Sequence, residues 1–169
     1  MNADNQSRLD LAKDLAKEAG EIGMTHFRDI GKLVIEQKGV QDMVSNADRE
    51  VETFVRERIS TAFPDDGIVG EEFGDTKGTS GYTWVIDPID GTWNFANGIA
   101  TYGVILAVIE DGETVFGLLY DPSYDDWIVS TKGQGAWFHH ANGTRRRLSL
   151  EAPAQASDSF GYVGMYLFA

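Results

Sequence analysis

Two aspartates that follow an apolar run are the residues of this sequence best suited to chemistry. Trp84–Ile86 leads into Asp87, Pro88 is expected to turn the chain, and Asp90 comes three residues after Asp87. Carboxylate and carbonyl oxygens are the ligands that Mg²⁺ takes in proteins, usually together with water and substrate phosphate. The spacing is therefore compatible with a site for divalent cations at the end of this strand.

Neighbouring residues extend this chemistry. Gly91 allows the backbone to approach a ligand closely, and Thr92 offers a hydroxyl and an N–H at a predicted helix start. Free N–H groups at a helix N-terminus bind phosphate oxygens. Upstream, Gly70-Glu71-Glu72 ends the preceding strand and could add a third carboxylate. One short segment could thus hold metal ions on its carboxylates and a phosphate ester on its amides.

The same residues are also common in turns. Asp-Pro and Asp-Gly pairs occur in many loops, and an aspartate often caps a helix. From spacing alone, a metal site and an ordinary capped loop both remain open.

Hydrophobic periodicity predicts the elements that must position these residues. A first amphipathic helix is predicted from a cap at Ser7 to about His26, and a second from about Ala47 to Ala62, where Pro64 prevents further growth. The predicted strands are Leu33–Gln37, Ile68–Val69, Tyr82–Ile86, Gly103–Ile109, Thr114–Tyr120, Trp127–Thr131, Ala136–His139 and Phe160–Ala169.

This order of elements predicts the fold class. Two helices followed by strands that are mostly joined as hairpins indicate an α+β layered domain, with the helices covering one face of a mostly antiparallel sheet. Asp111-Gly112 between two of the strands is a strong hairpin signal. With 169 residues, no repeat and no linker, the chain is expected to form one domain.

Composition argues against several classes of partner. The formal net charge is −13, which disfavours contact with nucleic acid or anionic lipid, because both begin with basic residues neutralising phosphates. The run Arg145–Arg147 is predicted to be a solvated strand edge, with a subunit or substrate contact as the alternative. No apolar run approaches the roughly 20 residues of a membrane span. The absence of cysteine and of a leader-like start fits a cytoplasmic enzyme.

Asp48 can be interpreted in two compatible ways. Ser45-Asn46-Ala47-Asp48 matches a capping box, in which Asp48 would close the first turn of the second helix. The same carboxylate could also take part in catalysis.

The extended string Trp84–Phe95, preceded by Gly70-Glu71-Glu72, resembles the signature of the inositol monophosphatase family. This family belongs to the lithium-sensitive, metal-dependent sugar phosphatases. Lys38 followed by Asp42–Asp48 resembles its upstream motif, and the match in order and spacing runs from the first helix to at least Phe138. The resemblance implies a sugar-phosphatase-type layered fold and a homodimer that hydrolyses a phosphate monoester of inositol or a sugar, using two or three Mg²⁺ ions.

The resemblance also implies roles for individual residues. Glu71, Asp87 and the main-chain carbonyl of Ile89 would bind a first metal ion. Asp87 would bridge to a second ion, which Asp90 also binds.

The remaining implied roles concern the phosphate and the water. The amides of Gly91 and Thr92 would hold the phosphate. Asp48 and the Thr92 hydroxyl would orient the attacking water.

The sequence departs from the family in its second half. Family members are considerably longer, and their second half supplies a Trp-Asp segment that completes the second metal site. Here the nearest match is Asp125-Asp126-Trp127, in reverse order and too early in the chain. Residues 1–169 are therefore expected to be an N-terminal metal- and phosphate-binding domain without its C-terminal α/β half.

Alternatives remain for the activity. Trp93 stands where members that act on nucleotide phosphates or histidinol phosphate tend to carry Lys, which favours inositol phosphates or sugar phosphates, including fructose 1,6-bisphosphate. A haloacid-dehalogenase type phosphatase is disfavoured because its two aspartates lie two residues apart, against three for Asp87 and Asp90. A truncated, non-catalytic binding or dimerisation module is the rival from another class.

Overall fold

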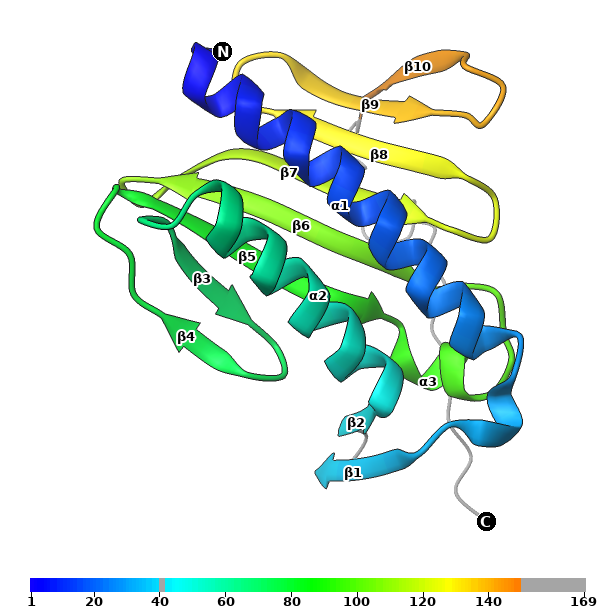
Figure 1. The fold of residues 1–169 in the computed structure, drawn as a ribbon. Coiled ribbons are helices and arrows are strands. Elements are labelled where there is room, and N and C mark those ends of the chain that lie inside the picture. Colours follow the sequence, from blue (N-terminus) through cyan, green and yellow to red (C-terminus); the bar gives the residue numbers. More distant parts are fainter. Residues whose placement is uncertain (40–41, 150–169) are drawn as a thin grey trace, which may run out of the picture.

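Two long helices pack side by side on one face of an eight-stranded sheet (Figure 1). The computed structural model describes residues 1–39 and 42–149. The elements, in chain order, are α1 Ala3–Phe27, the 3-10 turn η1 Ile30–Lys32, β1 Ile35–Gly39, β2 Asp42–Ser45, α2 Asn46–Ala62, β3 Gly67–Gly70, β4 Gly74–Thr76, β5 Tyr82–Asp90, α3 Thr92–Ala96, β6 Gly103–Glu110, β7 Glu113–Asp121, β8 Asp126–Thr131, β9 Gly135–His139 and β10 Arg145–Leu148.

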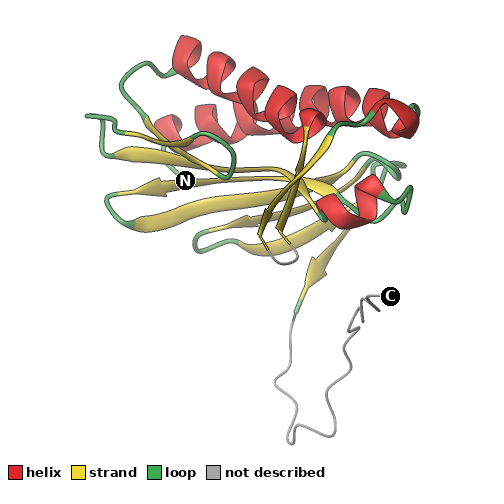
Figure 2. Ribbon diagram, turned by 90° about the horizontal axis from the view of Figure 1, so that it is seen from below, coloured by secondary structure: helices red, strands yellow, loops and turns green. Residues whose placement is uncertain are grey.

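The sheet confirms the predicted α+β class. Its strand order is β10-β9-β8-β7-β6-β5-β3-β4, and neighbouring strands are antiparallel except β3 and β5, which run parallel. Viewed along the sheet, α1 and α2 lie on the same side of it (Figure 2). Strands β1 and β2 form a separate hairpin next to α3.

Helix α1 begins earlier than predicted. The side-chain oxygen of Asn2 accepts a hydrogen bond of 2.7 Å from the Asn5 N–H, so Asn2 is the N-cap. The predicted cap at Ser7 is wrong, since this residue lies inside the helix and its hydroxyl donates to the Ala3 carbonyl. Helix α2 matches its prediction within one residue.

Most strand predictions are confirmed. Asp111 and Gly112 form a two-residue loop with positive φ angles of 49° and 85°, as the hairpin signal predicts. Strand β4 was not predicted because its Gly-Asp-Thr sequence has no apolar alternation. Leu33–Gln37 proves to be shifted by two residues, to β1. The predicted strand Phe160–Ala169 lies outside the described residues.

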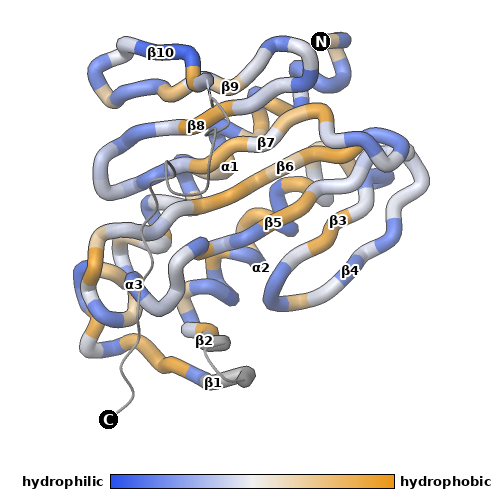
Figure 3. The backbone as a smooth tube through the Cα atoms, turned by 180° about the vertical axis from the view of Figure 1, so that it is seen from behind, coloured by the Kyte–Doolittle hydropathy of each residue, from blue (hydrophilic) through white to orange (hydrophobic). Residues whose placement is uncertain are grey.

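Hydrophobic residues are concentrated in the central strands (Figure 3). The main core lies between these strands and the two helices, where Trp84, Leu106 and Phe116 are almost completely buried. The arginines of β10 are exposed on an edge strand of the sheet, so the predicted edge position is confirmed. In the described residues, no helix is both long and apolar enough to cross a membrane.

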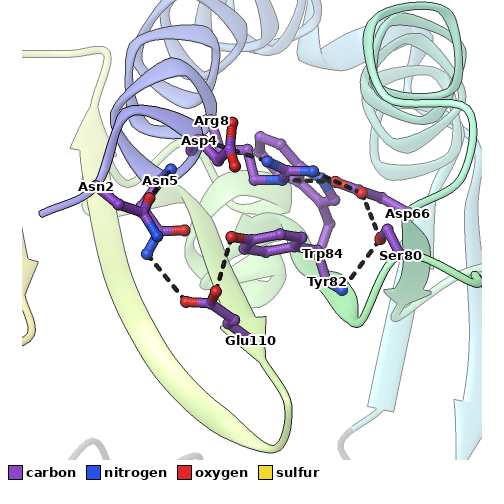
Figure 4. A network of polar contacts seen from close by, with 9 residues as sticks. All are labelled: Asn2, Asp4, Asn5, Arg8, Asp66, Ser80, Tyr82, Trp84 and Glu110. Carbon is purple, nitrogen blue, oxygen red and sulfur yellow. Dashed lines mark hydrogen bonds and ion pairs between the residues drawn. The ribbon is translucent and has the colours of Figure 1, made fainter.

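A buried ion pair ties α1 to the end of the segment that follows α2 (Figure 4). Arg8 binds Asp66 through two hydrogen bonds of 2.8 Å, and its guanidinium lies between the rings of Phe63 and Tyr82. Asp66 also accepts hydrogen bonds from Ser80 and Trp84. Only 1% of the Asp66 side chain is exposed, so its charge depends on these partners.

We predict that Asp66→Asn lowers the free energy of unfolding by about 3 kcal/mol, because it leaves the Arg8 charge buried without its partner. Burial alone would raise the pKa of Asp66, but the hydrogen bonds and the Arg8 charge lower it below the ordinary 3.8. A lowered folded pKa stabilises the fold above the unfolded pKa, and this contribution is lost as the pH falls through the folded value.

Urea unfolding at about pH 7 and about pH 3 measures both effects. The difference between the wild type and Asp66→Asn should shrink in acid. Asp65→Asn, at the exposed neighbouring position, is the matched control and should unfold like the wild type. Equal stability of the wild type and Asp66→Asn at neutral pH would contradict the prediction.

Candidate functional site

A β-bulge at the end of β5 brings the two predicted aspartates to the same face of the sheet. Asp87 pairs with Ile105 and Asp90 with Gly103, so two residues of β5 lie opposite one residue of β6. In a regular strand, residues three apart point to opposite faces, and the additional residue corrects this. Pro88 fits a bulge because it has no N–H to donate. The expectation that Pro88 turns the chain is therefore wrong: the strand continues to Asp90.

A small second core lies beneath the bulge. Ile89, Phe95 and Tyr102 are buried together with Ala47 at the start of α2. The rings of Phe95 and Tyr102 meet edge to face at 4.8 Å. This cluster holds β5, α3 and the N-terminus of α2 together, which places residues far apart in the sequence at one end of the sheet (Figure 1).

Asp48 is both a helix cap and a member of the site. Its Oδ2 accepts hydrogen bonds from the Ser45 N–H at 2.9 Å and the Ser45 hydroxyl at 2.5 Å, which confirms the predicted capping box. Its Oδ1 accepts from the Thr92 hydroxyl at 3.1 Å. Burial raises the pKa of Asp48, although the hydrogen bonds from Ser45 and Thr92 oppose that change. The buried carboxylate is therefore more basic than an exposed one.

Thr92 and Gly91 begin the short helix α3. The Thr92 hydroxyl also lies 3.1 Å from the Ile89 carbonyl oxygen, so it bridges the bulge and α2. Gly91 has φ +89° and ψ 37°, and a Cβ there would lie 3.0 Å from the Thr101 carbonyl oxygen. Only glycine adopts this backbone conformation without strain.

Glu71 and Glu72 follow β3 in the turn that leads to β4. The strand ends at Gly70, so both glutamates lie in the turn and neither belongs to the strand. The Glu71 side chain is exposed, whereas Glu72 is half-buried. Of these two, Glu71 acts electrostatically on Asp87.

Asp87 is the most perturbed acid of the site. Burial, followed by the charges of Glu71 and Asp90, raises the pKa of Asp87 to about 8. Its Oδ1 is buried and has no hydrogen-bond partner. A buried acceptor surrounded by like charges is costly unless a cation or a proton compensates it.

These donors suit a hard divalent cation. All the predicted ligand atoms are oxygens, which hard cations prefer. The Asp87 Oδ1 is a buried acceptor without a hydrogen-bond donor. Among the described residues, no group of three or more His, Cys, Asp or Glu side chains is already drawn together closely enough to hold a metal ion. Mutual repulsion of the carboxylates opposes such a group until a cation offsets it.

One residue beside the site, Glu52, belongs to none of the predicted motifs. Glu52 is completely buried on α2, and its contacts reach the Glu71–Phe73 turn. The available signal was its position between Val51 and Val55, on the apolar side of a predicted helix.

Comparison with known proteins gives these residues a family context. The model of the inositol monophosphatase family matches residues 4–164. The chain belongs to the inositol monophosphatase family. This confirms the resemblance that the Asp87–Phe95 segment suggests.

Individual members of the inositol monophosphatase family are similar to the chain over most of its length. It is 34% identical over 160 residues to the fructose-1,6-bisphosphatase/inositol-1-monophosphatase of Thermotoga maritima, covering 95% of this chain and 59% of that protein. It is 36% identical to the histidinol-phosphatase of Chlorobaculum parvum, covering 88% of this chain and 56% of that protein. The chain thus spans little more than half the length of these relatives.

A solved structure agrees with the inositol monophosphatase fold. The extragenic suppressor protein SuhB from Bartonella henselae superposes with a TM-score of 0.76 at 32% identity. The superposition covers 78% of this chain and 52% of the SuhB chain. The layered arrangement of helices and sheet is therefore that of the family.

We predict that Asp87→Asn stabilises the metal-free protein by about 1 kcal/mol at about pH 9. An acid with a raised folded pKa destabilises the fold as it ionises, so this effect grows between pH 3.8 and about 8. The gain is kept small because partial solvation screens the charges.

Thermal or urea unfolding in a chelator measures this prediction. The gain should shrink as the pH falls toward 3.8 and vanish well below it, where the carboxyl is protonated in both states. Asp14→Asn, on the exposed side of α1, should show no such pH dependence. A less stable Asp87→Asn protein at high pH would contradict the prediction.

Proposed function

We propose that the protein is a magnesium-dependent phosphatase that hydrolyses a phosphate monoester of inositol or a sugar. The observation that carries the proposal is the arrangement around Asp87. Its unpartnered buried oxygen lies under the charges of Glu71 and Asp90, beside the hydrogen-bonded pair of Asp48 and Thr92.

Two groups of ligands follow from the family resemblance. Glu71, Asp87 and the Ile89 carbonyl would hold one Mg²⁺ ion, and Asp87 with Asp90 would hold a second. A third ion belongs to the same proposal. Bound Mg²⁺ would acidify the attacking water and offset the negative charge that develops on the phosphate and the leaving oxygen.

The protein's own groups would position the reactants. The amides of Gly91 and Thr92 would bind the phosphate oxygens, since the left-handed conformation of Gly91 begins α3 at the end of the bulge. The Thr92 hydroxyl donates to Asp48 and keeps a lone pair with which to accept from the attacking water. The raised pKa of Asp48 favours acceptance of that water's proton.

The substrate proposal rests on one position. Trp93 follows Thr92 where family members that act on nucleotide phosphates or histidinol phosphate tend to carry Lys, and this favours inositol or sugar phosphates. Fructose 1,6-bisphosphate is the second candidate, because the Thermotoga maritima relative carries both activities in its name. Residues 1–169 would form the metal- and phosphate-binding domain, and a homodimer in the cytoplasm remains the prediction from sequence.

We predict that phosphate release from inositol 1-phosphate needs Mg²⁺ and that Asp87→Asn lowers its rate by about 100-fold or more, because Asp87 would contribute to both metal positions. Inorganic phosphate is measured with and without Mg²⁺, with fructose 1,6-bisphosphate and histidinol phosphate as competing substrates. Asp14→Asn is the control with the same chemical change outside the site.

Three outcomes distinguish the phosphatase proposal, its substrate class and the non-catalytic alternative. Mg²⁺-dependent release that Asp87→Asn abolishes supports the phosphatase. Faster release from histidinol phosphate would overturn the substrate class while keeping the activity. A folded protein that binds Mg²⁺ or the esters without releasing phosphate would support the non-catalytic module instead.

A further inference from the structure

Glu52 lies one helical turn after Asp48 on α2 and is completely buried, with 0% of its side chain exposed. Burying a carboxylate is costly unless charge and hydrogen bonds compensate it. Glu52 has such partners, and they belong to the turn that carries Glu71.

The Glu52 carboxylate faces three donors. Its Oε2 accepts from the Glu72 N–H at 2.7 Å, and its Oε1 accepts from the Phe73 N–H at 3.3 Å and from Arg56 Nε at 2.6 Å. Two consecutive amides directly after Glu71 are therefore held by one side chain. Because the Glu71 side chain itself is exposed, the backbone that carries it sets its direction.

Gly70, at the start of the turn, allows the backbone to lie close to the Glu52 carboxylate. A Cβ at Gly70 would lie 2.0 Å from Glu52 Oε1, so any larger residue at this position would displace the carboxylate. Arg56 continues the contact, since its guanidinium donates to the Gly74 carbonyl and, at 3.3 Å, to Thr76 Oγ1. The turn and strand β4 thus both form hydrogen bonds with residues of α2.

Asp48, Glu52 and Arg56 recur every four residues and lie along one side of α2. Asp48 contacts Thr92, whereas Glu52 and Arg56 contact the β3–β4 hairpin. Four residues of helix correspond to a rise of about 6 Å. A rigid helix therefore fixes the separation between Asp48 and the Glu71 turn.

We infer that Glu52 is a positioning residue: its carboxylate holds the backbone of the Glu71–Phe73 turn so that Glu71 faces Asp87. The inference rests on the proposed function, in which Glu71 and Asp87 share a metal ion. Glu52 itself touches neither metal nor substrate in this scheme, and it acts through the two amides.

Glu52→Gln tests the inference with little change in size. The glutamine amide would set an NH₂ group against donors that now meet oxygen, so at least one of the three contacts is lost. Amide hydrogen exchange at Glu72 and Phe73 should become faster by about tenfold or more relative to the rest of the protein. Mg²⁺ affinity, measured by calorimetry, should fall by about 10- to 100-fold, as for other residues that orient metal ligands.

Glu57→Gln is the matched control, since it makes the same change at an exposed position of the same helix. It should leave exchange and Mg²⁺ affinity at wild-type values. A merely structural Glu52 would lower global stability and speed exchange throughout the protein, without a local effect at Glu72 and Phe73. If Glu52→Gln does not fold, Gly70→Ala disturbs the same contact from the turn side and should give the same two changes.

The outcomes distinguish this inference from the proposed function. A wild type that binds no Mg²⁺ would overturn the proposed function and, with it, the role of Glu52. A wild type that binds Mg²⁺, together with a Glu52→Gln protein that binds it equally well and exchanges Glu72 and Phe73 at the wild-type rate, would overturn the inference alone.

Discussion

The candidate site requires carboxylates that repel one another to be held at one end of a sheet. Asp48, Glu71, Asp87 and Asp90 come from a helix, a turn and a bulged strand, and three of them act electrostatically on the fourth, Asp87. Like charges in a partly buried region oppose folding, so other contacts must hold these residues in place. The described structure supplies those contacts through the backbone and through the small core around Ile89 and Phe95.

Two buried acids outside the predicted set of ligands have different surroundings. Asp66 and Glu52 are each met by an arginine and by further donors, whereas Asp87 has an oxygen without a partner. Paired buried charges fix elements to one another, whereas an unpaired buried oxygen on an acid with a raised pKa is typical of a candidate ligand site. Asp66 and Glu52 therefore connect elements of the fold, whereas Asp87 keeps one oxygen available for a ligand.

Much of the fold could be predicted from the sequence because its signals are local. Helical periodicity, the Ser45–Asp48 capping box and the Asp111-Gly112 turn each determine structure within a few residues, and they were found correctly. The start of α1 and the continuation of β5 through Pro88 were missed. In both cases one local signal misleads: Asn2 rather than Ser7 caps α1, and β5 continues through Pro88 to Asp90.

The sequence indicates which residues could form the candidate site but not the contacts that position them. A carboxylate motif shows which residues could bind a metal, while the bulge that turns Asp87 and Asp90 to one face depends on pairing with β6. The role of Glu52 depends on a contact with residues 20 positions away. Such contacts arise only when the chain is packed, so the sequence offered no more than a glutamate on an apolar helix face.

Stability and cation binding are opposed in such a site. When several carboxylates lie close together without a cation, their repulsion lowers the free energy of unfolding. Cation binding to the folded state then raises this free energy again. Contacts that fix the ligand residues in advance favour cation binding, because less conformational entropy is lost when the cation binds. The capped start of α2 and the turn held by Glu52 are supports of this kind, so one helix orders two of the four carboxylates before any ligand is present.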